Sequence, residues 1–144
     1  MLHTHIDGLR ITASYSKGAV MVTLKLAQVI GVRVGLVTHI GIVSDRQADG
    51  VPMVISNSLR VGGVAEEPLS VFQGSYPLVT VAQPAVLPAW YVLSRARQML
   101  GTRWNLLTWN CEHFVFWTHG LESKSPQLNR AFLGLAAVLL IAKA

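Results

Sequence analysis

The residues most able to do chemistry in this sequence are a lone cysteine and a histidine in an apolar run. Cys111 is the only cysteine among the 144 residues. It follows Asn110, a good helix N-cap, whose side-chain oxygen can accept hydrogen bonds from the amides of the first turn. A thiol at a helix N-terminus has a lowered pKa and is more nucleophilic at neutral pH. We therefore expect Cys111 to be a nucleophile; the alternative is a buried cysteine that packs as a small apolar side chain.

His39 lies within residues 37–45, whose short, β-branched and apolar pattern predicts a buried strand. A lone histidine on an apolar face is more often a core residue, but paired with a helix-capped cysteine it is a candidate general base. Gly41 is on the same face of this strand. Its missing side chain would leave space beside the imidazole for a helix end or a substrate.

The elements needed to hold these two groups together are those of an α+β fold. The Asp49-Gly50 pair predicts a tight turn that joins the His39 strand to the next strand as a hairpin. We expect a short antiparallel sheet packed against the helix that carries the cysteine. The expected elements are strands at 9–13, 37–45, 53–58, 64–67 and 76–81, helices at 17–32 and 89–100, a helical turn at 69–72, and a helix from Cys111 that Gly120 ends.

Two segments together resemble the lecithin–retinol acyltransferase family, which belongs to the NlpC-type superfamily of permuted papain-like enzymes. They are THIGIV at 38–43 and NCEHFV at 110–115, and RARQMLG at 95–101 is similar to the helix that precedes the cysteine in that family. The histidine precedes the cysteine along the chain, as in the permuted enzymes. The resemblance implies a cysteine hydrolase or acyltransferase that forms a thioester acyl-enzyme on Cys111 with His39 as base. Its substrate would be a lipid ester or an amide such as a cell-wall peptide.

The third polar residue of the family is usually a histidine on the strand after the histidine strand, where it orients the imidazole. Here that strand reads MVISNS at 53–58 and contains no histidine. Counting along the strand places Ser56 at the family's position, whereas Asn57 is chemically the better orienter because its amide oxygen can accept from an imidazole N–H. A shift of one residue exchanges the faces of the two. We expect Asn57 to be the third site residue, with Ser56 as the alternative.

Composition limits the class of protein and its partners. Hydrophobic residues make up 51% of the chain and charged residues 13%, and the length suits one domain. Basic residues outnumber acidic ones by 12 to 7, which favours anionic surfaces such as phospholipid headgroups. Basic runs interleaved with aromatics are absent, so we expect no nucleic-acid partner. His3 and His5 could bind a metal, but no cluster of ligands completes a site. We therefore expect neither a metal nor a cofactor.

The C-terminal residues 131–142 form an unbroken apolar run. We expect a catalytic domain at 1–122, a polar linker at 123–130 and an apolar helix or tail at 131–144. A helix of twelve residues reaches ~18 Å, less than the ~30 Å hydrocarbon core of a bilayer. A helix that is apolar all round needs a membrane surface, an oligomer partner or the core to cover it.

Residues 1–9 contain no apolar segment typical of a signal peptide, which favours a cytoplasmic or peripheral membrane location. A phage or viral component is a further interpretation. The alternative function is that of a structural or scaffold module of a viral or membrane assembly with a vestigial papain-like site.

Overall fold

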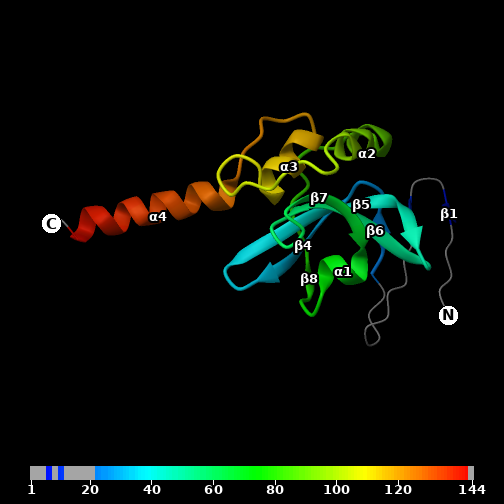
Figure 1. Ribbon diagram of the computed structural model, residues 1–144, viewed down its shortest axis with the longest axis horizontal. Coiled ribbons are helices and arrows are strands. Elements are labelled where there is room, and N and C mark those ends of the chain that lie inside the picture. The colour runs from blue at the N-terminus through cyan, green and yellow to red at the C-terminus, as the bar shows by residue number, and fades with distance from the viewer. Residues whose placement is uncertain (1–5, 8–9, 12–21, 143–144) are drawn as a thin grey trace.

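The computed structural model describes residues 6–7, 10–11 and 22–142, and its main feature is a sheet with helices on both faces (Figure 1). The main sheet has the order β7-β6-β5-β4-β8, and every neighbouring pair is antiparallel. Its strands are β4 (Val29–Val34), β5 (Val37–Ala48), β6 (Val51–Ser58), β7 (Gly63–Pro68) and β8 (Leu78–Val79). A smaller sheet joins β1 (Ile6–Asp7), β2 (Arg10–Ile11) and β3 (Leu24–Lys25).

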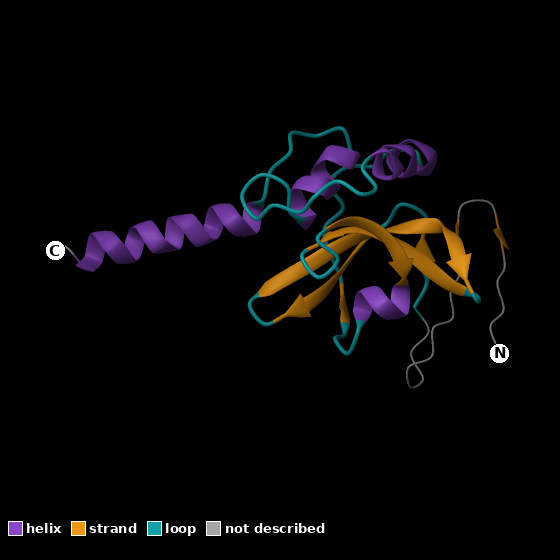
Figure 2. Cartoon of the chain, in the orientation of Figure 1, coloured by secondary structure: helices purple, strands orange, loops and turns teal. Residues whose placement is uncertain are grey.

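The described residues include four helices. Helix α1 (Leu69–Gln73) lies against one face, and α2 (Ala89–Gln98) and α3 (Cys111–Thr118) lie on the other (Figure 2). Helix α4 (Pro126–Ala142) projects away from the domain. The expected α+β architecture is thereby confirmed, with the cysteine on the first residue of a helix that packs on the sheet.

The strand alternation of β5 and β6 divides the core between the two faces. Ile42 and Ile55 are cross-strand partners and pack under α2 and α3 with Phe114. The next pair, Val43 and Val54, points to the opposite face and belongs to the cluster beneath α1. Fully burying side chains of this kind contributes roughly 1.5–3 kcal/mol each before ordering costs. The two faces therefore carry separate apolar clusters, one under the cysteine helix and one under α1.

The hairpin between β5 and β6 depends on the predicted turn. Asp49 and Gly50 both have positive φ, 49° and 77°, the left-handed conformation that a tight hairpin turn requires. Pairing between the two strands runs from Ala48–Val51 to Ile42–Ile55. Beyond that point β5 stays paired with β4, and β6 stays paired with β7. The two central strands therefore separate at one end of the sheet, and this opening creates the site.

Two expected elements near the sheet edge are corrected. The predicted helix at 17–32 is wrong where the structure describes it, because Val29–Val34 is a strand paired on both sides. Its β-branched residues suit a sheet better than a helix. Gly31 is also needed there, since a Cβ would lie 2.7 Å from Val81 Cγ2. The predicted strand at 76–81 is reduced to Leu78–Val79.

Several other elements occur where they were predicted. They are the helical turn of α1, helix α2, strands β6 and β7, and α3, after which Gly120 takes a positive φ of 69°. The expected strand at 9–13 is described only at Arg10–Ile11, and His3 and His5 lie outside the described residues.

The C-terminal helix begins earlier than the sequence pattern indicates. Helix α4 starts at Pro126, so residues 126–130, five of the eight in the expected linker at 123–130, are helical. No residue of α4 is buried, and Leu133 and Ile141 are 71% and 76% exposed. In the described part of the chain, no helix combines the length and hydropathy needed to cross a membrane.

Candidate functional site

Helix α3 begins at Cys111 because Asn110 and His113 form a capping box. The Asn110 Oδ1 atom accepts from the amides of Glu112 at 3.0 Å and His113 at 3.2 Å. The His113 Nδ1 atom accepts in turn from the Asn110 amide at 3.2 Å. Such reciprocal bonds satisfy first-turn amides that have no partner within the helix. The predicted N-cap is confirmed, and His113 fixes the backbone on which Cys111 is placed.

Asn57 holds the segment that leads into this helix. It is fully buried on β6, and its Nδ2 atom donates to the carbonyls of Trp109 at 2.6 Å and Asn110 at 3.3 Å. Its Oδ1 atom is buried with no partner. The expected hydrogen bond from the His39 imidazole to the Asn57 amide oxygen is therefore not what the structure shows. Asn57 contacts the chain immediately before the cysteine.

The register of the sheet explains this difference. Asn57 is two residues from Ile55 and shares its face, the one under α3. His39 shares the face of Gly41, whose added Cβ would lie 3.1 Å from the Cβ of Ser56 and 2.9 Å from the ring of Phe72. The alternative candidate, Ser56, therefore lies on the face of His39, and Asn57 does not.

His39 is partly buried near the separated end of β5, beside α1. Its ring centroid lies 5.1 Å from that of Phe72, at an interplanar angle of 36°. Burial lowers the pKa of His39 to about 4; the carboxylate of Glu67 opposes this shift and Arg60 adds to it. In the part of the chain that the structure describes, no side chain hydrogen-bonds the imidazole. His39 is consequently neutral at pH 7 and able to accept a proton.

The pKa of the Cys111 thiol differs from the expectation. Burial raises the pKa of Cys111, a backbone hydrogen bond from Ile40 opposes the shift, and the nearby carboxylate of Glu112 raises the pKa further. The expected lowering by the helix N-terminus is therefore wrong, because desolvation of the thiolate outweighs the nearby amides. The contact with Ile40 also shows where the sulfur lies: it is next to the backbone of the residue that follows His39.

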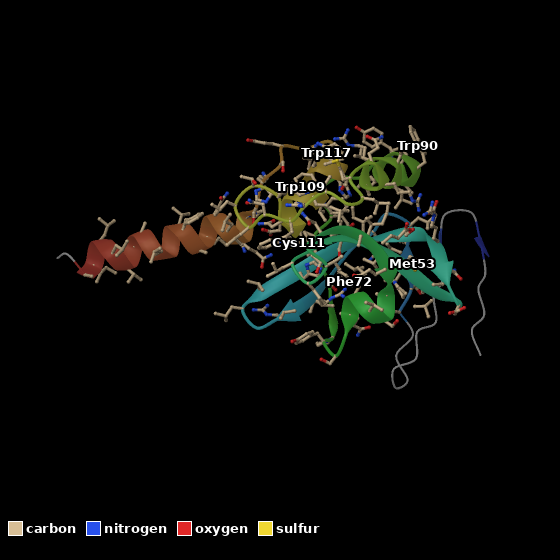
Figure 3. All side chains as sticks on the ribbon, viewed as in Figure 1. Met53, Phe72, Trp90, Trp109, Cys111 and Trp117 are labelled. Carbon is tan, nitrogen blue, oxygen red and sulfur yellow. The ribbon has the colours of Figure 1, made fainter. Side chains whose placement is uncertain are left out.

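Both candidate groups line one cavity of about 710 Å³. Figure 3 shows Cys111 where α3 meets the sheet, and Phe72 on α1. The lining is mainly apolar, and its polar members include Ser58, Arg60 and Gln73. Its apolar members include Val32, Val34, Val37, Val71, Phe72 and Leu128. A cavity of this size and lining suits an apolar ligand with a few polar groups that orient it. Among the described residues, no group of three or more His, Cys, Asp or Glu could hold a metal ion.

A hydrogen-bonded chain beside the cavity was not predicted. Glu112 is buried, and its Oε2 atom accepts from Ser125 Oγ at 2.5 Å and from the Gln127 amide at 3.0 Å. The side chain of Gln127 bonds both backbone groups of Thr38, each at 2.8 Å. The sequence did carry one signal: Ser125 followed by Pro126 is a typical helix start. The contact across 89 residues had no local signal.

Comparison with known families agrees with this geometry. The family model described as lecithin retinol acyltransferase matches residues 23–122, a range that contains both the His39 strand and the Cys111 helix. No curated protein matches the chain.

Proposed function

The chain belongs to the lecithin retinol acyltransferase family, a family of thiol hydrolases and acyltransferases, and on this premise we propose that Cys111 is its nucleophile and His39 its base. The observation that supports the proposal is the proximity of the two residues. Cys111 and His39 line the same cavity, and the sulfur contacts the backbone of Ile40, the neighbour of His39. An acyl hydrolase or acyltransferase needs this pairing of a thiol and an imidazole.

The electrostatics favour a neutral pair before substrate binds. With the pKa of His39 lowered and that of Cys111 raised, the resting forms are imidazole and thiol. The Cys111 sulfur attacks the acyl carbonyl carbon as His39 accepts the S–H proton, which gives a tetrahedral intermediate and an imidazolium. The intermediate then expels the alcohol or amine, which takes the proton from His39, and leaves a thioester on Cys111. Water or another alcohol or amine finally accepts the acyl group.

Backbone amides next to the Cys111 sulfur support an oxyanion hole at this position. The amides of Glu112 and His113 are occupied by the Asn110 side chain. The amide of Cys111 is in the first turn, where no helical carbonyl is available to it. It lies at the sulfur, as does the backbone of Ile40. Donors fixed at this point would stabilise the charge that develops on the carbonyl oxygen.

The cavity favours a lipid ester over a cell-wall peptide amide. Most of its lining is apolar, which suits an acyl chain, whereas a peptide would require more polar partners. The lining continues onto α4 through Leu128 and Ala131. Beyond these residues α4 exposes apolar side chains on its whole circumference, including Phe132, Leu133, Leu135, Val138, Leu139, Leu140 and Ile141. This continuity supports peripheral contact of α4 with a lipid surface, with an oligomer contact as the alternative.

The test is turnover of dispersed esters that differ in acyl-chain length. The wild-type chain should hydrolyse or transfer the acyl group, with kcat/KM rising as the chain lengthens from two to about ten carbons, because each buried methylene contributes about 0.8 kcal/mol. Cys111→Ser and His39→Gln should each reduce kcat by at least a hundredfold. Turnover that survives Cys111→Ser would contradict the proposal. Absence of turnover on every ester and amide tested would favour the scaffold alternative.

A further inference from the structure

The separated end of β5 carries backbone groups that β6 no longer pairs. Alternate residues of a strand direct their N–H and C=O groups to the same side. Ile40 and Thr38 are such alternate residues, and Ile40 contacts the Cys111 sulfur. Thr38 is bonded at both its N–H and its C=O by the side chain of Gln127, at 2.8 Å each. The first turns of α3 and α4 thus occupy the opening where β6 has diverged.

Gln127 is tied in turn to the residue that follows the nucleophile. The backbone N–H of Gln127 donates to Glu112 Oε2 at 3.0 Å, and Ser125 Oγ donates to the same oxygen at 2.5 Å. The chain of bonds Thr38–Gln127–Glu112 therefore joins the neighbour of His39 to the neighbour of Cys111. Glu112 and Ser125 are buried, so the bond between them is shielded from competing water, whereas the bonds of Gln127 are partly buried.

The His39 imidazole has no side-chain hydrogen-bond partner within the described residues, and Asn57 faces the cysteine segment instead. The alignment of base and nucleophile must then come from the main chain that carries them. We propose that Gln127 is a positioning residue for the reaction, which holds the His39 strand against the Cys111 helix by bridging Thr38 and Glu112. This inference rests on the proposed function, since it assigns the alignment of that same pair.

The structure offers a matched control for this role. Gln83 bonds the backbone of Val29 in the same way: its Oε1 atom accepts from the Val29 amide at 2.7 Å, and its Nε2 atom donates to the Val29 carbonyl at 2.9 Å. Val29 is on β4 and does not line the cavity. Replacing either glutamine by methionine keeps the side-chain length and removes both bonds to the strand; at Gln83 it also removes a bond to the Val81 carbonyl. Only the change at Gln127 should disturb the alignment of His39 and Cys111.

The experiment compares steady-state kinetics and Cys111 alkylation in the wild type, Gln127→Met and Gln83→Met. We expect Gln127→Met to lower kcat on a short-chain ester at least tenfold with KM changed less than twofold. It should also lower the rate of iodoacetamide alkylation at pH 7, because the thiol loses its base, and this rate should recover at higher pH. Gln83→Met should leave kcat and the alkylation profile within twofold of wild type, even if both variants lose similar thermal stability.

A second variant covers the case in which Gln127→Met does not fold. Gln127→Glu keeps an acceptor for the Thr38 amide, but its carboxylate has no hydrogen for the Thr38 carbonyl, so we expect the same loss of kcat at pH 7. An active wild type with equal kcat in the Gln127 and Gln83 variants would overturn this inference and leave the proposed function intact. A wild type without turnover or a reactive thiol would overturn both.

Discussion

Lowering the pH should weaken the native state through His39, by an amount that follows from its burial. The imidazole has a pKa of 6.5 when exposed and about 4 in the folded chain. At pH 5 the unfolded chain therefore binds a proton that the folded chain largely excludes. By the linkage relation, this difference lowers the unfolding free energy, relative to neutral pH, by about 2 kcal/mol at pH 5 and about 3 kcal/mol below pH 4. No stability is lost through His39 above pH 6.5; the loss grows as the pH falls from 6.5 to 4 and levels off below 4.

The assay is urea unfolding, followed by tryptophan fluorescence at pH 8 and pH 5, for the wild type and His39→Gln. His113 and His119 also have pKa values lowered by burial, so both chains should lose stability at pH 5. The wild type should lose about 2 kcal/mol more than the variant, because only the wild type carries the imidazole of His39. Equal losses in the two chains would refute the argument, since they would show that His39 is hydrated and titrates near its ordinary pKa.

Three further predictions concern the base, the segment before Cys111 and the C-terminal helix. The acid limb of kcat/KM should lie near pH 4, because protonating His39 removes the base; a limb near pH 6.5, followed in the same ester assay, would contradict a buried neutral imidazole. Asn57→Leu should lower the unfolding free energy by roughly 2 kcal/mol, measured in urea, since it removes two hydrogen bonds from a buried side chain to the Trp109 and Asn110 carbonyls, whereas Ser56→Ala should change it by less than half as much. Deleting residues 132–144 should abolish flotation with anionic liposomes and leave the melting temperature within a few degrees, because that part of α4 buries nothing; a truncated chain that unfolds would show that α4 belongs to the core.

The local elements of the site could be predicted from the sequence because their signals are local. The Asn110 cap, the start of α3 at Cys111 and the Asp49-Gly50 turn each depend on a few adjacent residues. The helix expected at 17–32 failed because an apolar pattern with helical spacing can also suit a strand, and pairing with β5 and β8 decides the outcome.

The relation of the site residues to one another could not be predicted in this way. Asn57 contacts the cysteine segment because β6 separates from β5 one residue beyond Ile55, which is a property of the whole sheet. The pKa of Cys111 is raised because packing buries it, and a helix N-terminus alone does not reveal how much water remains. Gln127 reaches Thr38 only because α4 begins beside the cavity.

The central claim is that Cys111 carries the acyl group with His39 as its base, and intact-mass spectrometry of the quenched reaction tests it most directly. After rapid acid quenching, the wild-type chain should gain the mass of the acyl group of the ester supplied. The adduct should map to the peptide that contains Cys111, and neutral hydroxylamine should release it, as expected for a thioester. The adduct should be absent in Cys111→Ala and should form at least a hundredfold more slowly in His39→Gln. An adduct on another residue, or equal rates of formation in the wild type and His39→Gln, would contradict the account.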